Sequence, residues 1–414
     1  MNEHIEEALE SFRSSAGRYA RSERYYRGDH DLAFATEKFA NAFGSLFREF
    51  ALNLCPAVCD AVRDKLRIMG FEAPEPFRRA AESIWFRNRM AIRAGEAHRE
   101  AVTSGDAYVI VWPDETGRAA MHPNAAANCR VFYDAEHPGR VLRAAKYWRE
   151  RGGRTRLNLF YRDRIERYVS EADPAGGLPA LREFAEFREG GASVVPNPFG
   201  VVPVFHFANN ADIGSFGTSE LEQAKPIQDG LNKTVLDMLV AMEYCAYRQR
   251  WAAGIEIKYD ANKNPVAPFQ AGVDHLWTSE NPNARFGDFN TADLEQFLKV
   301  KDGFRIDIAS VTGTPMNYLM PHSGSFPSGE ALRKAESRFI AKVRDRQAAF
   351  GQVWADAVGF ALRIEHGVDD VQLTTRWEDP ARLTEAEELQ NLLLKRQIGL
   401  TEERALDEAG YSAG

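Results

Sequence analysis

The thiols of this sequence are its side chains best suited to metal binding. Cys55 and Cys59 are separated by three residues, a spacing that would make half of a zinc site. No histidine or cysteine pair of suitable spacing completes the set, and Pro56 stands between the two thiols. Because small buried cysteines are common in protein cores, the pattern favours two core residues, and neither a metal nor another cofactor is expected.

Groups for catalysis are equally hard to assemble. Asp106 and Asp134 lie at predicted strand boundaries, where turn chemistry accounts for an aspartate. The segment Gly-Ser-Phe-Gly at 214–217 has neither the spacing nor the lysine of a phosphate-binding loop. Four histidines stand apart from any serine or cysteine in a recognisable nucleophile motif: His122, His206, His322 and His366. The sequence therefore predicts a protein that is not an enzyme.

The composition of the chain narrows the class of protein further. The 414 residues suffice for two or three core-bearing units, and a hydrophobic content of 44% is that of a folded protein. No apolar run approaches the length of a membrane span, the N-terminus is acidic, and only four cysteines occur. These features predict a protein of a reducing cytosol, without a membrane anchor. A net charge of −8 argues against clamping nucleic acid with the whole surface, but allows a local patch or a passage to which DNA does not stick.

The first half of the chain predicts one α+β domain. Helical spacing, as in Ile5, Leu9 and Phe12, gives way at Ala107 to alternating or continuous apolar runs, the pattern of strands. The predicted helices cover residues up to the turn at 25–30, then 39–50, 56–67 (ended by Gly70) and 84–104. The predicted strands, read as an antiparallel meander, cover 107–112, the segment around 131–133, 141–148, 157–161 and 164–169, and a last strand follows at 201–207.

The second half predicts long helices joined by small pieces. A capping-box pattern at Thr218 begins a helix that Pro226 should kink or restart. Short β-like pieces follow over 255–277, then a helix from Thr291 to about Phe304 and possibly on to Val311. After Gly367 the predicted elements are a strand at 371–377 and two polar helices at 384–397 and 401–409.

A breaker-rich loop and a long helix occupy residues 311–363. Prolines, glycines and hydroxyl residues over 311–329 predict irregular structure. From Glu330, with Ser328 as the expected N-cap, apolar residues recur every three or four positions for roughly nine turns. The apolar stripe is Leu332, Ala335, Phe339, Val343, Arg346, Phe350, Val353, Ala357 and Phe360.

This order of elements resembles the portal proteins of tailed bacteriophages, the head-to-tail connector family, over almost the entire chain. Six phrases carry the resemblance, in the right order: 25–30 (YYRGDH), 53–70, 105–112 (GDAYVIVW), 217–233, 328–332 (SGEAL) and 377–380 (WEDP). The resemblance implies seven parts: a wing (1–217), a stem helix (218–254), a clip (255–289), a returning stem helix (290–311), a tunnel loop (312–329), a long helix (330–366) and a short crown (367–414).

The resemblance also implies a function and partners. Such proteins form a ring, usually a dodecamer, around a channel through which double-stranded DNA enters and leaves the capsid. The implied partners are the terminase large subunit, which supplies ATP hydrolysis, the head-tail adaptor, and the major capsid and scaffold proteins. The implied location is the portal vertex of the virion, and the host cytoplasm during assembly.

Two sets of residues are candidates for contacts. The tunnel loop has no Lys or Arg between 314 and 328, so it can touch a moving duplex without gripping it. Its expected DNA-channel residues are Thr314, Met316, Asn317, Tyr318, His322, Ser323, Ser325, Phe326 and Ser328. The expected partner or DNA contacts of the stem and clip are Arg248, Arg250, Lys258 and Lys263, for which solvated charge at a helix end is the competing interpretation.

The basic residues of the long helix have two interpretations, and so does the whole chain. With acidic residues among them, a nucleic-acid stripe and salt bridges between subunits both fit Arg333, Lys334, Arg338, Lys342, Arg344 and Arg346. The alternatives to a portal are an α+β hydrolase or transferase with an unrecognised pocket, and another phage structural component such as a minor capsid or adaptor protein.

Overall fold

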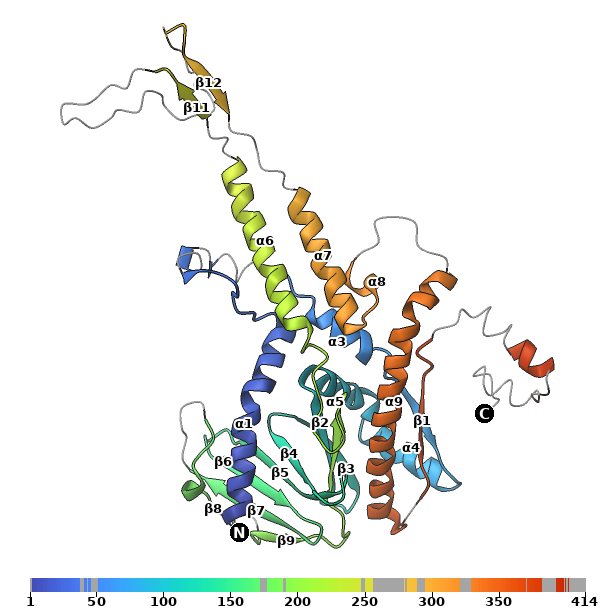
Figure 1. Ribbon diagram of the computed structural model, residues 1–414. Helices are drawn as coiled ribbons and strands as arrows, with labels where there is room; N and C mark the ends of the chain where they lie inside the picture. Colours follow the sequence, from blue (N-terminus) through green and yellow to red (C-terminus); the bar gives the residue numbers. More distant parts are fainter. Residues whose placement is uncertain are drawn as a thin grey trace. The chain divides into compact units, whose positions relative to one another are not determined.

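The chain folds into two compact units, seen in a computed structural model. The described residues are 2–37, 41–42, 44–45, 51–171, 177–188, 191–246, 250–255, 279, 281–288, 295–320, 329–369, 371–381, 392–397, 399 and 401. Unit 1 comprises Met1–Asp29, Asn53–Pro226 and Asp307–Gly414, and unit 2 comprises His30–Leu52 and Ile227–Ile306. The fold is mixed α+β, as predicted (Figure 1).

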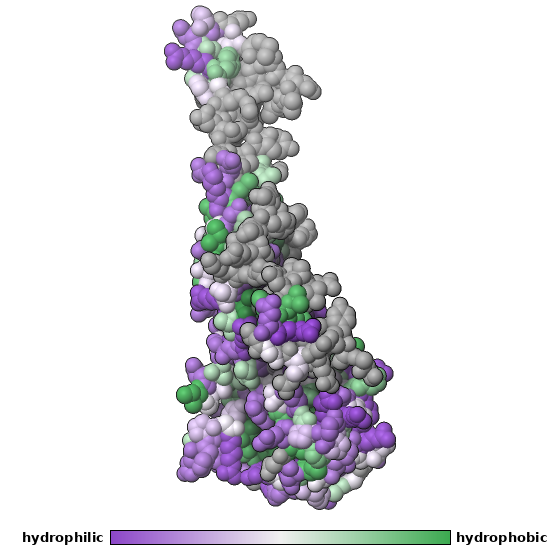
Figure 2. Space-filling view, turned by 90° about the vertical axis from the view of Figure 1, so that its right-hand side faces the viewer, coloured by the Kyte–Doolittle hydropathy of each residue, from purple (hydrophilic) through white to green (hydrophobic). Residues whose placement is uncertain are grey.

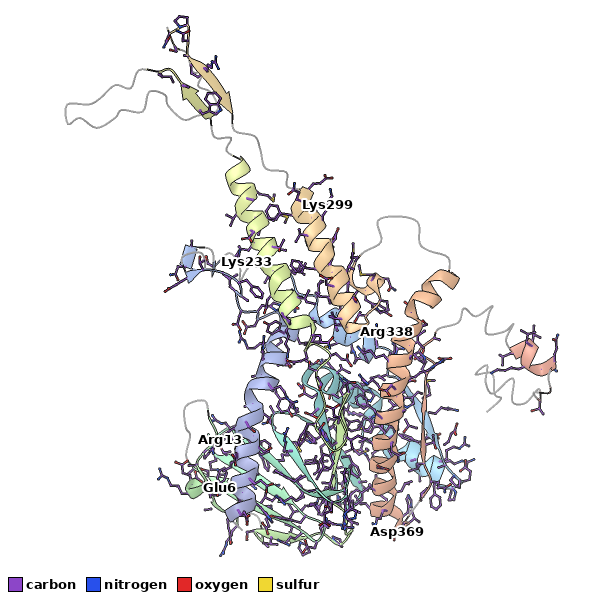
Figure 3. The ribbon with its side chains drawn as sticks, viewed as in Figure 1. Glu6, Arg13, Lys233, Lys299, Arg338 and Asp369 are labelled. Atoms are coloured by element: carbon purple, nitrogen blue, oxygen red, sulfur yellow. The ribbon has the colours of Figure 1, made fainter. Side chains whose placement is uncertain are left out.

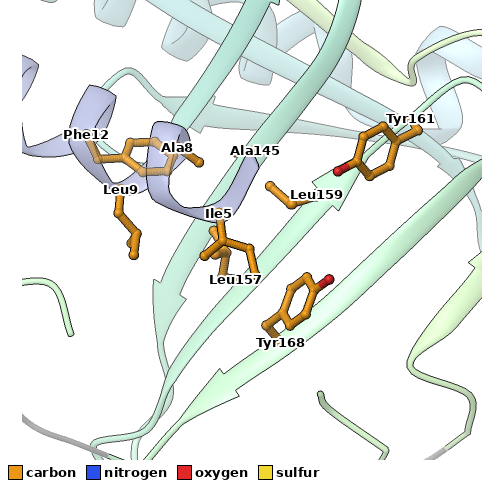
Figure 4. Packing of buried hydrophobic residues seen from close by; sticks show 9 residues of the cluster. All are labelled: Ile5, Ala8, Leu9, Phe12, Ala145, Leu157, Leu159, Tyr161 and Tyr168. Carbon is orange, nitrogen blue, oxygen red and sulfur yellow. The ribbon is translucent and has the colours of Figure 1, made fainter. Parts of the chain in front are cut away.

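An antiparallel sheet covered by the first helix forms one half of unit 1. Helix α1 (Asn2–Arg27) buries Ile5, Leu9 and Phe12 against this sheet, as its spacing predicts (Figure 4). The predicted antiparallel order β4-β5-β6-β7 is confirmed, and two strands that were not predicted, β8 and β9, pair with β7. Its strands are β4 (Cys129–Tyr133), β5 (Val141–Arg149), β6 (Thr155–Phe160), β7 (Arg164–Ser170), β8 (Ala185–Glu186) and β9 (Val194–Pro196), and a short 3-10 turn covers Leu181–Glu183.

A separate three-stranded sheet, in the order β10-β2-β3, corrects the prediction of a single meander. Its strands are β2 (Asp106–Pro113), β3 (Ala119–Ala125) and β10 (Val204–Ala208). Tyr108 and Ile110 of β2 pack on the meander sheet, and the alternate residues Val109 and Val111 are buried toward the opposite side. Because both faces of β2 are covered, its sequence is continuously apolar.

Helices pack around this smaller sheet. Helix α9 (Gly329–His366) lies against β2, β3 and β10, and α5 (Met90–Ser104) lies against the same strands. The stripe residues Phe339, Val343, Phe350, Ala357 and Phe360 are all buried, so the predicted long helix and its inward face are confirmed. Beside them lie α3 (Cys55–Arg63), α4 (Phe77–Arg87) and the two-stranded sheet of β1 (Ile68–Glu72) and β13 (Thr374–Trp377).

Three predicted helix boundaries are wrong in unit 1. The helix after Pro56 ends at Arg63, and Gly70 lies inside β1 rather than ending a helix. The single helix over 84–104 is two helices, because Arg89 adopts a φ of 54° between them. Helix α6 begins at Ala224 instead of Thr218, so Pro226 falls in its first turn, where the missing amide costs nothing.

Unit 2 is built from two helices and a small hairpin-like sheet. Helices α6 (Ala224–Ala246) and α7 (Glu295–Thr312) run side by side through it (Figure 1), and a Cβ at Gly230 would lie 3.1 Å from the Phe304 ring. Glycine thus lets the aromatic ring rest directly on α6. Strands β11 (Arg250–Ala253) and β12 (Arg285–Asp288) pair antiparallel, with the Trp251 indole over Gly287. The predicted helix over 39–50 and the β-like pieces over 256–277 lie largely or wholly outside the described residues, as do most of the helices predicted after residue 384.

Candidate functional site

Helix α7 ends at a threonine that hydrogen-bonds to its own last turn and is followed by a glycine. Thr312, its last residue, donates its hydroxyl to the Ile308 carbonyl at 2.7 Å. Gly313 follows with a φ of 68°, the left-handed conformation in which glycine commonly ends helices. The Thr314 side chain is buried, 2.9 Å from the Thr312 hydroxyl. The chain therefore enters the loop in a fixed direction.

The next residues pack along α9 instead of forming an irregular loop. Met316–Leu319 make a single helical turn, α8, which corrects the prediction that the whole of 311–329 lacks regular structure. Asn317 donates its side-chain amide to Glu336 on α9 at 3.1 Å. The Tyr318 ring lies 5.9 Å from that of buried Phe339, and Leu319 is also buried. The first half of the predicted tunnel loop is thus anchored to the long helix.

A buried carboxylate and two cations join the segment before α6 to α9 near the end of α7. Glu220 forms ion pairs with Lys342 and with Arg346, the latter at 3.2 Å. Lys342 also donates to the carbonyl of Thr312 at 2.8 Å, so one ammonium joins Glu220 to the last residue of α7. A cation at a helix C-terminus stabilises the unpaired carbonyls there. Asn209 adds a hydrogen bond to Glu220 at 3.1 Å.

Electrostatics decide the charge of Glu220. Burial by itself would raise the pKa of this carboxyl group, but the positive charges of Lys342 and Arg346 outweigh burial, and the pKa lies below its ordinary value. Glu220 is therefore ionised at neutral pH, and the pair is a true ion cluster. Lys342 and Arg346 thus pair with a carboxylate of their own chain, an arrangement that neither interpretation of these basic residues included.

A polar hollow of about 460 Å³ opens beside this cluster. The segment before α6, the end of α7 and the side of α9 form its walls, with Glu220, Lys342 and Gly313 among the lining residues. Arg338, exposed on α9 (Figure 3), and Asp345 stand at its edge. Opposite charges line the hollow together, which does not favour a nucleic-acid phosphate there.

A second buried carboxylate organises the segment that leads to Glu220. Asp106 accepts hydrogen bonds from the Tyr19 hydroxyl at 2.7 Å, His206 Nε2 at 2.8 Å and the Gly217 amide at 2.7 Å, and pairs with Arg18 at 2.8 Å. Burial raises the pKa of Asp106, but the hydrogen bonds, led by that from His206, bring it below its ordinary value. The prediction that turn chemistry explains Asp106 is therefore wrong.

The Asp106–His206 pair is structural. His206 receives the Tyr133 hydroxyl on Nδ1 at 2.6 Å, and the side chains of His206 and Asp106 are 2% and 0% exposed. Both imidazole nitrogens are occupied by protein groups, so neither can meet a substrate. By contrast, Asp134 has the predicted turn role, since its carboxylate accepts the amide of Glu136 at 2.9 Å.

The structure divides the predicted contact residues into three groups. Thr314 is buried in the single chain, with its hydroxyl 2.9 Å from that of Thr312. Met316, Asn317 and Tyr318 lie on α8, and Arg250 begins β11. The remaining predicted contacts lie outside the described residues: His322, Ser323, Ser325, Phe326, Ser328, Arg248, Lys258 and Lys263.

The candidate metal ligands are core residues. Cys55 and Cys59 are buried in α3, and burial raises the pKa of the Cys59 thiol well above its ordinary value. Across the described ranges, no cluster of three or more histidine, cysteine, aspartate or glutamate side chains is placed to hold a metal ion. Nor does any helix within those ranges have the length and apolarity needed to cross a membrane.

Sequence reasoning missed Glu220, Lys342 and Asp106 as structural centres. Glu220 was taken as part of a helix-capping pattern, and Lys342 as one of several basic residues on a long helix. The two are 122 positions apart in number and meet only when α9 packs beside the segment before α6. No local spacing could have signalled that contact.

Comparison with known proteins identifies this kind of fold. A chain of the solved structure described as "Neck of native GTA particle computed with C12 symmetry" has a TM-score of 0.52 and 12% identity, and the match covers 91% of this chain and 94% of that one. The portal protein of Mycobacterium phage L5 is 24% identical over 377 residues, covering 85% of this chain and 74% of the relative. The portal protein of Mycobacterium phage D29 has the same identity and coverage.

Residues 64–406 match the family described as "Phage portal protein, SPP1 Gp6-like". The chain belongs to this family of phage portal proteins. Portal proteins are structural and non-enzymatic, and the resemblance drawn from the sequence phrases is confirmed.

Replacing Glu220 by glutamine is expected to destabilise unit 1 in a pH-dependent way. The variant leaves two buried cations without their carboxylate, which typically costs about 3–5 kcal/mol at neutral pH. The stability from ionised Glu220 is present above its unfolded pKa of 4.5 and is lost as pH falls through the lower folded value. Urea unfolding of both proteins at pH 7 and pH 4 should therefore show a smaller difference at pH 4.

Glu115, exposed in the turn between β2 and β3, supplies the matched control. Glu115→Gln should unfold like the parent protein at both pH values. A Glu220→Gln variant as stable as the parent at pH 7 would show that the ion cluster contributes nothing.

Proposed function

We propose that this protein forms a ring, of about twelve copies, at one vertex of a phage capsid, and that the genome is packaged and ejected through its centre. The observation that carries the proposal is unit 2, where α6 and α7 run side by side and are joined through the β11–β12 sheet. In a member of the portal family, two such helices fit the stem of a channel and the sheet fits its clip. The C12 symmetry of the neck particle with a similar fold supports the copy number.

Exposed apolar side chains on α7 support assembly into a ring. Leu298, Val300 and Ile306 are 46%, 49% and 53% exposed in the single chain. Apolar residues exposed together on one helix are typical of surfaces that pack against another chain. Side-by-side copies of the helix pair would cover them, and a closed ring leaves every copy with the same contacts.

The charge pattern supports a channel that does not hold DNA tightly. The chain carries a net charge of −8, and 314–328 has no Lys or Arg. Each phosphate neutralised by a cation adds affinity through counterion release, which would slow a sliding duplex. We propose that 314–328 is the tunnel loop, with its first residues anchored on α9 and its later residues facing DNA.

The clip is the proposed docking platform for the terminase large subunit and the head-tail adaptor. Lys258 and Lys263 fall within the sequence between β11 and β12. Repeated around a ring, one or two lysines per copy would make a basic collar for an acidic partner surface. Major capsid and scaffold proteins are the further proposed partners, in the host cytoplasm during assembly and at the vertex of the virion afterwards.

The first test is the native mass of the purified protein, with negative-stain images of the same sample. A closed ring of about a dozen copies with a central hole is the expected result, because neighbouring copies would cover the exposed apolar residues of α7. A stable dimer without a central hole would contradict the proposal.

Deleting residues 323–326 tests the tunnel loop. The ring should form with unchanged native mass, because the contacts of α8 with α9 are retained, while DNA packaging or retention should fall at least tenfold. A matched control deletes four residues from 172–176, in the sequence between β7 and the 3-10 turn at Leu181–Glu183. Unchanged packaging by the tunnel-loop deletion would count against this assignment.

Charge reversal at Lys258 and Lys263 tests the clip. The double variant Lys258→Glu, Lys263→Glu should form rings and bind adaptor or terminase at least tenfold more weakly, with the loss greatest at low salt, where charge attraction is least screened. Arg188→Glu, between β8 and β9, whose side chain is 78% exposed, is the control. Normal docking by the double variant would remove the claim.

A further inference from the structure

A large groove in unit 1 has an apolar floor and exposed apolar edges. It has a volume of about 680 Å³ and lies between the end of α3, β1, α4 and α5. Leu66, Met90 and Ala94 form its buried floor, and half-buried Trp85 forms one wall. These residues give the groove a surface on which an apolar helix face can pack.

Exposed apolar side chains gather around this groove. Hydrophobic residues are scattered between hydrophilic ones on the surface seen in Figure 2. Met69 and Ile92, which both line the groove, are 58% and 71% exposed. Single exposed apolar residues need no explanation, but two that line the same groove, above an apolar floor, indicate a surface that another segment covers.

The C-terminal segment of the same chain leaves the fold at this groove. After β13, the amide of Glu378, a lining residue, donates to the Arg67 carbonyl at 2.9 Å. Lys65, between two lining residues, donates to the Pro380 carbonyl at 2.9 Å. The segment that follows therefore begins within reach of the groove.

That segment carries an exposed apolar helix of its own. Residues 392–397 are helical, and Leu393 and Leu394 are 60% and 53% exposed. The ten residues 382–391 connect this helix to the groove edge and can span up to roughly 33 Å when extended. A tether of this length gives the helix a high effective concentration at the groove, which favours its own chain over any free partner.

We propose that the helix at 392–397 docks its leucines into this groove of its own chain. Docking covers Met69, Ile92 and Leu393 together and fastens the C-terminal segment onto α4 and α5. The proposal does not depend on the channel function, since it concerns one chain folding on itself.

Chemical crosslinking tests the contact. Cys245 is replaced by serine in every variant, so that only the introduced thiols react with the crosslinker. The other cysteines, Cys55, Cys59 and Cys129, are buried and stay in place. The variant Ile92→Cys, Leu393→Cys is treated with a short bis-maleimide and compared with Ile92→Cys, Lys395→Cys. Positions 393 and 395 point about 200° apart on a helix, so only the first pair should face each other.

A crosslink within one chain that forms at least five times faster for the Leu393 pair is the expected result. Adding Met69→Asp should slow that crosslink several-fold, because the charge disfavours an apolar contact. Equal rates for the two pairs, or crosslinks that join two chains, would overturn the proposal.

Trypsin provides a second readout without introduced cysteines. Cleavage after Lys395 and Arg396 should be several-fold faster in Ile92→Asp than in the parent chain, since docking protects the helix. Leu142→Asp, at a 39% exposed position on β5, is the control for an added charge elsewhere. Cleavage at the same rate in all three proteins would also overturn the proposal.

Discussion

The structure depends on one buried carboxylate, that of Asp106 at the start of β2. A carboxylate removed from water is costly unless donors surround it. Here α1 supplies Tyr19 and Arg18, β10 supplies His206, and the segment before α6 supplies the Gly217 amide. Gly105 and Gly217 allow the backbones to meet, since a Cβ at Gly217 would lie 1.9 Å from the Gly105 carbonyl oxygen. The hydrogen bonds to the Asp106 carboxylate and the close approach of the Gly105 and Gly217 backbones therefore favour the same packing of these segments.

A continuous network leads from Asp106 to the end of α7. Asn209 donates its amide to the Gly105 carbonyl at 2.8 Å, and its side chain reaches Glu220 at 3.1 Å. Glu220 then pairs with Lys342, which holds the carbonyl of Thr312 at 2.8 Å. The position where the proposed tunnel loop begins is thus fixed by the same polar contacts that join α1 to the sheets.

The same network shows how α9 serves two purposes. Its apolar stripe packs on β2 and β10, while Lys342 and Arg346 on that helix face Glu220. One rigid helix therefore sets the position of both the core and the loop anchor. Tyr318 and Asn317 contact residues nearer the N-terminal end of α9, so α8 packs against α9.

Local pattern determined much of this protein. The period of Ile5, Leu9 and Phe12, the apolar run of β2 and the stripe of α9 each predicted an element and its buried face, because burial imposes the period. Strand β3 escaped prediction, since Pro123 and its polar neighbours break the alternation, and Gly70 was taken for a helix end although it lies in β1. The six phrases shared with portal proteins identified the family, because recognising a family needs only the order of such phrases along the chain.

Only the tertiary structure decided which charged and polar residues matter. Asp106, Glu220 and Lys342 look ordinary in sequence, and their roles come from distant partners: His206 lies 100 positions from Asp106, and Lys342 lies 122 positions from Glu220. It also showed that Thr314 is buried and that β2, β3 and β10 form a sheet of their own. The physical reason is that period and composition record how much of an element is buried, whereas pairing of charges depends on which elements meet.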